Sequence, residues 1–130
     1  MAYNERRWGS DAWTRQLRTV GQADGCKFGG WVWWPATLQG HRLVLLAQRK
    51  GGPALGDRAK DVLFRLAYEE SKNISDTATL LEAAKELGLD EDGAVAAFLK
   101  SDDGRAEVSE RPWTPTTVLV DAHAVCGCCR

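Results

Sequence analysis

The residues best suited to chemistry lie near the end of the chain, where three of the four cysteines occupy the last five positions. Thiolates are nucleophiles and metal ligands, so such a cluster can exchange disulfides or bind a soft metal. Cys126, Cys128 and Cys129, together with His123, also offer four zinc donors. Four donors within seven residues rarely close an unstrained tetrahedron, and we therefore expect no metal. A disordered tail, left by truncation or an imperfect gene model, is the alternative that we favour.

Two other groups of polar residues were candidates for chemistry. His41 falls between Leu38 and Leu45 in the rows of a predicted helix, so we expect it to face the packed side. A histidine in that position is more often a packed residue than a ligand or a proton carrier. Asp90 and Asp92 lack the spacing of a calcium loop, which excludes that site.

Composition limits the possible class and partners. With 130 residues the chain forms one domain at most, and 44% hydrophobic with 27% charged residues is typical of a soluble globular protein. A net charge of -1 gives no electrostatic reason to expect nucleic acid or membrane as a partner. No apolar run approaches the roughly 20 residues of a membrane span. The first residues lack the apolar segment of a signal peptide, so we expect a cytoplasmic protein with reduced thiols and no cofactor.

Helices dominate the predicted structure. Leu63 and Leu66 share the widest apolar face, so we expect both in the core. The helix that follows should begin at Ser75-Asp76, whose short side chains can accept the first amide protons, and should end at Gly88. Asp90 is the expected cap of the helix that follows. The predicted helices span about residues 10–22, 37–50, 57–72, 75–88, 90–101 and 105–110, with a break at Gly51-Gly52-Pro53.

A tryptophan-rich segment connects the first two helices. Residues 26–35 contain Trp31, Trp33 and Trp34, flanked by glycines and a proline that favour an extended or looped connection. Such rings can form a ligand platform, but they more often bury apolar area against a helix, and we prefer the packing interpretation.

Several segments together resemble a known family. They are WWPATL (33–38), GHRLVLLA (40–47), LFRLAYEE (63–70), NISD (73–76), LLEAA (80–84) and AFLKSD (97–102). In order and spacing they resemble the helical insertion of DsbA-like thioredoxin-domain proteins, specifically the FrnE-type branch. The resemblance covers roughly residues 3–108, and no single motif carries it alone.

The resemblance implies a fold and a chemistry. The implied fold is mainly α, the helical insertion of a DsbA-like thioredoxin (α/β) fold with an incomplete sheet of at most one or two short strands. The implied domains are a DsbA-like helical region at 1–112 and a possible strand with a Cys-rich tail at 113–130. The family's chemistry is thiol–disulfide exchange, performed by a Cys-x-x-Cys pair at a helix N-terminus that faces a cis-proline. This sequence has no such pair ahead of its helices.

The resemblance also supplies the candidate site residues. Pro115 resembles the cis-proline that precedes a strand, here at 117–120. In a conflicting alternative, residues 118–121 resemble the first strand of a thioredoxin and lead to Cys126 and Cys129, which resemble a Cys-x-x-Cys pair and are the catalytic candidates. Two functions remain open: a disulfide oxidoreductase that acts on protein thiols or disulfides, or a non-catalytic helical binding or scaffold domain. With the sheet incomplete, we expect an exposed apolar patch and self-association through it.

Overall fold

A computed structural model describes residues 5–6, 9–10, 12–25, 27–28, 35–89 and 93–110 of the chain. These residues form helices and turns, and no strand occurs among them. The elements are α2 (Ala12–Ala23), α3 (Leu38–Phe64), the π-helical turn η1 (Arg65–Glu69), α4 (Thr77–Glu86), α5 (Ala94–Lys100) and α6 (Arg105–Ser109). The mainly helical fold class predicted from the sequence is confirmed.

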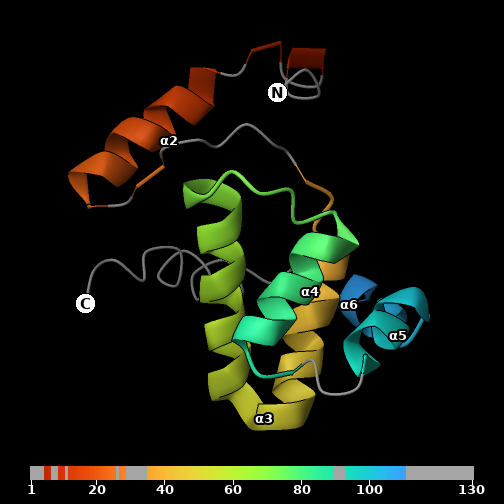
Figure 1. Ribbon diagram of the computed structural model, residues 1–130. Helices are drawn as coiled ribbons and strands as arrows, with labels where there is room; N and C mark the ends of the chain where they lie inside the picture. The colour runs from red at the N-terminus through yellow and green to blue at the C-terminus, as the bar shows by residue number, and fades with distance from the viewer. Residues whose placement is uncertain are drawn as a thin grey trace.

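Helix α3 is bent into a hairpin at the glycines that the sequence marks as a break (Figure 1). Gly52 has φ +73° and ψ -172°, a conformation open in practice only to glycine. Pro53 follows at a position where its missing amide proton costs nothing, because the first turn of a helix has no acceptor for it. The two halves of α3 therefore lie side by side, with Gly40 of the first half facing Leu63 of the second.

The core lies where the α3 hairpin meets α4 and α5. Leu63 and Leu66 are 6% and 1% exposed, so their predicted place in the core is confirmed. Leu81 and Phe98 are half-buried against this core. The core residues are Leu43, Val44, Ala47, Ala59, Val62, Leu63, Leu66, Ala67, Ile74, Leu80, Ala83, Ala84, Leu87, Leu89, Val95 and Leu99.

The C-terminal end of α4 follows its local sequence signal, whereas the side-chain cap predicted at its start is not observed. Gly88, with φ +69°, donates its amide proton to Lys85 O at 3.0 Å, and Leu89 donates to Ala84 O at 2.9 Å. These two bonds form a Schellman motif, which satisfies the last carbonyls of the helix. At the other end Asp76 is the N-cap without a side-chain bond, whereas Ser75 Oγ accepts the Ala36 amide proton at 2.8 Å. Ser75 thus ties the start of α4 to the segment that enters α3.

Arg42 joins the first half of α3 to the end of α5. Its side chain is 1% exposed, and its guanidinium donates to the carbonyl oxygens of Phe98, Leu99, Ser101 and Asp103 at 2.8–3.2 Å. The terminal carbonyls of a helix have no partner within the helix, so a buried helix end needs external donors. The guanidinium also lies 4.9 Å from the centre of the Phe98 ring. One buried cation therefore fixes the whole segment between α5 and α6.

Some sequence predictions need correction or fall outside the described residues. The helix predicted at 57–72 begins earlier, directly after the glycine break, and ends as the π-helical turn η1. Ser71 then has φ +59°, which ends the helical path. The prediction that Asp90 caps the helix that follows is wrong, because α5 begins at Ala94 with Gly93 as its N-cap. The tryptophans of residues 26–35 lie outside the described residues, as does the whole of the predicted region 113–130.

Replacing Arg42 by methionine should lower the free energy of unfolding. The change removes the guanidinium bonds from four carbonyls; Phe98 O keeps the Ser101 donors and Leu99 O keeps a long bond from Gln39, whereas Ser101 O and Asp103 O lose their Arg42 bonds. A buried acceptor left without a partner costs about 1–3 kcal/mol. We expect a loss of about 2–4 kcal/mol in the free energy of unfolding, measured by urea denaturation. Arg58→Met is the matched control, because exposed Arg58 makes one 3.4 Å bond to the Glu86 carbonyl at the end of α4. Equal losses in the two variants would contradict the anchoring role.

Candidate functional site

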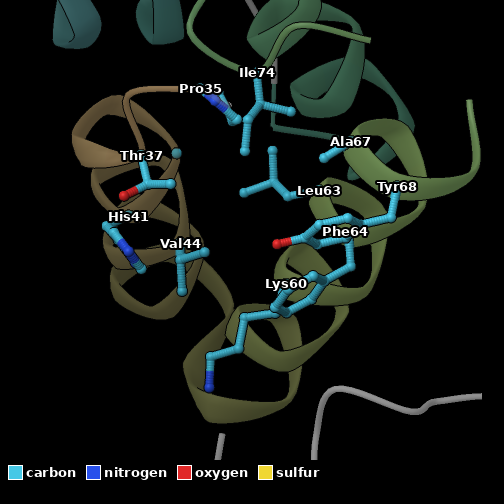
Figure 2. Close-up of a pocket in the computed structure, with 11 residues that line it drawn as sticks. Pro35, Thr37, His41, Val44, Lys60, Leu63, Phe64, Ala67, Tyr68 and Ile74 are labelled. Atoms are coloured by element: carbon cyan, nitrogen blue, oxygen red, sulfur yellow. The ribbon is translucent and has the colours of Figure 1, made fainter. Parts of the chain in front are cut away.

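A pocket of about 250 Å³ opens between the two halves of α3 (Figure 2). The first half and the segment before it supply one wall, and the second half with η1 supplies the other. Its described lining residues are Pro35, Thr37, Gly40, His41, Val44, Lys60, Leu63, Phe64, Ala67, Tyr68 and Ile74. Most of these side chains are apolar, as in pockets that bind small organic molecules.

Gly40 leaves the room that the pocket occupies. A Cβ atom at this position would lie 3.6 Å from Leu63 Cδ1 and 3.9 Å from Ile74 Cδ1, in ordinary van der Waals contact. A larger side chain would enter the space between the two halves of α3. The small residue therefore sets the distance between the pocket walls.

Tyr68 reaches into the pocket from η1, with its hydroxyl group directed towards Leu63 and Val44 (Figure 2). Its ring stacks on Phe64, with centroids 5.5 Å apart, and meets Phe28 edge-on at 5.8 Å. Such aromatic pairs hold the rings in defined positions. Burial raises the pKa of the Tyr68 phenol above its ordinary value, because the charged phenolate loses hydration there. Tyr68 therefore presents a neutral hydrogen-bonding group to the pocket.

His41 and Lys60 provide the polar rim of the pocket. The structure shows His41 to be exposed, so the prediction that it faces the packed side is wrong. One face of the first half of α3, with Arg42 and Leu45, packs towards α5 and α6. A second face, with Gly40 and Val44, packs towards the other half of α3. His41 lies between these two faces, on the part of the helix surface that neither contact covers. It nevertheless borders the pocket.

The described part of the pocket lining contains no thiol and no cluster of metal ligands. None of its described lining residues is a cysteine, and no group of His, Cys, Asp and Glu among the described residues could hold a metal ion.

No described helix combines the length and apolarity needed to cross a membrane.

Comparison with protein families decides the relationship that the segments at 33–102 suggest. A family model of the DsbA-like thioredoxin domain matches residues 17–112, well over half of the chain. The chain belongs to the DsbA-like thioredoxin-domain family. No curated protein and no solved structure matches it.

In this DsbA-like protein the pocket and the candidate cysteines belong to different parts of the chain. All of the pocket-lining residues lie within the matched span, which ends at residue 112. Cys126, Cys129 and Pro115 follow that span, and all three lie outside the described residues, as does His123. Their predicted roles in catalysis remain predictions.

Sequence reasoning missed both the pocket and Arg42. The pocket depends on a glycine facing another segment across the hairpin, which a reading of one helix at a time does not reveal. An arginine within the apolar run at 40–47 was the available signal for Arg42, because a buried charge requires partners.

The raised pKa of Tyr68 makes stability depend on alkaline pH. The folded state holds the proton of the Tyr68 hydroxyl more tightly than the unfolded state does. Its contribution to the free energy of unfolding is therefore fully present below about pH 10, the ordinary pKa of tyrosine, and is lost as pH rises through the raised pKa. We expect the free energy of unfolding to fall more between pH 8 and pH 11 in the wild type than in Tyr68→Phe, with both measured by urea denaturation. Identical falls in the two proteins would show that Tyr68 titrates as an exposed phenol.

Proposed function

We propose that this chain is the helical part of a FrnE-type DsbA-like protein, and that it binds a partner protein without exchanging disulfides itself. The division into a helical region at 1–112 and a short tail at 113–130, and a cytoplasmic location, belong to the same proposal. The observation that carries it is the position of the family match, which covers the helices and ends before the terminal cysteines. The partner's class follows from the family, whose members act on protein thiols and disulfides.

The placement of the cysteines supports a non-catalytic role. A thiol–disulfide exchanger needs a nucleophilic thiolate near neutral pH, whereas an ordinary cysteine has a pKa of about 8.5. A helix N-terminus lowers that value through its amide protons and dipole. The residues before α3 include one cysteine, Cys26, so no Cys-x-x-Cys pair precedes the helices of this chain. The alternative function is exchange by Cys126 and Cys129.

Insulin reduction separates these two functions. We expect the wild type to be no faster than a simple dithiol at equal thiol concentration, and the Cys126→Ser, Cys129→Ser double variant to match it within twofold. Cys26→Ser is the matched control, since it removes a thiol outside the pair. A large loss of turnover confined to the double variant would overturn the proposal and make the terminal cysteines a working site.

Self-association is the interaction that the exposed apolar side chains of α2 favour. Leu17 and Val20 are 48% and 53% exposed, and they lie three residues apart on one face of α2. Large apolar side chains grouped in this way mark interaction surfaces.

We expect the sedimentation coefficient of the wild type to rise with concentration. A Leu17→Gln, Val20→Thr double variant should shift that rise to a concentration at least about fivefold higher, because each lost apolar contact weakens association. Gln16→Ala, a change at an exposed polar position of the same helix, is the control. A wild type that stays monomeric over the whole range would contradict this proposal.

A further inference from the structure

We propose that the α3 pocket binds a small organic anion whose apolar body lies between the two halves of α3 and whose carboxylate meets Lys60. This inference goes beyond the proposed function, because it requires neither a thiol nor a partner protein. The apolar body is accounted for by Val44, Leu63 and Ile74, three buried side chains that face the pocket. A volume of about 250 Å³ is at the small end for a ligand site, which limits the body to one ring or a short chain.

The charge of the lining favours an anion. Lys60 and His41 are the ionisable groups at the rim, and none of the described lining residues is acidic, although the whole chain has 18 acidic residues. Figure 2 shows the Lys60 side chain running from Phe64 towards the first half of α3, with its nitrogen at the lower edge of the pocket, below Val44. A lysine can cover apolar surface with its stem and keep its ammonium group at the edge. A carboxylate at this edge would meet one full positive charge.

The existing partner of Lys60 does not remove this capacity. Lys60 Nζ lies 3.2 Å from Asp57 Oδ1, three residues earlier in the same helix. The Asp57 side chain is 70% exposed, and surface ion pairs of this kind contribute about 0–1 kcal/mol. An ammonium group has three donors, so one bond to Asp57 leaves two for a ligand. Asp57 itself is not among the residues that line the pocket.

Tyr68 adds a neutral phenol to the apolar part of the site. Its hydroxyl group points into the pocket, between the walls rather than at the rim. A neutral phenol at this depth adds no charge to the apolar part of the site, and its ring is available for contact with the ligand's body. The site therefore distinguishes the two ends of a ligand: charge is accommodated at the edge near Lys60, and apolar atoms are accommodated next to Tyr68 and Leu63.

A pair of probes that differ in charge tests the proposal. Binding of 4-phenylbutyrate and of the neutral 4-phenylbutan-1-ol to the full chain is measured by isothermal titration calorimetry and by methyl chemical shifts. We expect the acid to bind about two- to fivefold more tightly than the alcohol, since a partly exposed ion pair contributes up to about 1 kcal/mol. The shifts should centre on the methyl groups of Val44, Leu63 and Ile74.

Lys60→Met isolates the charge, because methionine keeps an apolar stem of similar length. This variant should reduce the affinity for the acid to that for the alcohol and leave the affinity for the alcohol unchanged. Lys85→Met, at an exposed position on α4 outside the pocket, is the matched control and should change neither affinity.

Four results would each overturn the proposal. They are equal affinity of the wild type for acid and alcohol, equal weakening of both probes in Lys60→Met, no binding of the acid at millimolar concentration, and methyl shifts centred away from the pocket. The insulin assay is unaffected by any of these outcomes, so failure of this site and failure of the proposed function are distinguishable.

Discussion

The buried Arg42 guanidinium is the interaction on which the arrangement of helices depends. Four backbone carbonyls between Phe98 and Asp103 converge on it, and the side chain of Gln39 accepts a further bond at 2.6 Å. Helix α5 has seven residues, too few to be stable alone, so its position must come from tertiary contacts. Two turns further along α3, Arg49 binds Asp103 and Glu107, which extends the same attachment to α6. The first half of α3 thus holds both small helices through arginines.

Attachment of α5 and α6 to one side of α3 leaves the opposite side free for the pocket. Arg42 and Leu45 face the small helices, whereas Gly40 and Val44 face the second half of α3. The Gly51-Gly52 break brings that second half alongside, and η1 carries Tyr68 to the open end. A π-helical turn displaces side chains from the regular helical rows, and such turns are frequent at functional sites. The pocket is therefore a product of the hairpin bend together with the local irregularity of η1.

Local signals in the sequence were sufficient for most of the helical fold. The break at Gly51-Gly52, the stop at Gly88 and the burial of Leu63 and Leu66 all follow from backbone freedom or helical periodicity, which depend on neighbouring residues. The site could not be predicted in this way. Whether His41 is exposed depends on which two faces of α3 are covered, and the role of Arg42 depends on carbonyls more than fifty residues away. The apolar pattern alone predicted neither the exposure of His41 nor the role of Arg42.

The pocket and the terminal cysteines belong to different parts of the chain, which explains why ligand binding and thiol chemistry can be independent. Each wall of the pocket is held by contacts among α3, η1 and Ile74, all inside the span that the family model matches. None of those contacts involves a cysteine, so oxidation or reduction of the terminal thiols changes no group in the pocket walls described here. A redox centre in this family obtains its reactivity from a helix N-terminus next to the cysteine pair. The pocket obtains its selectivity from a glycine gap, apolar walls and one lysine at the rim. These requirements do not overlap, and the helical region can therefore bind ligands whether or not the chain carries a working cysteine pair.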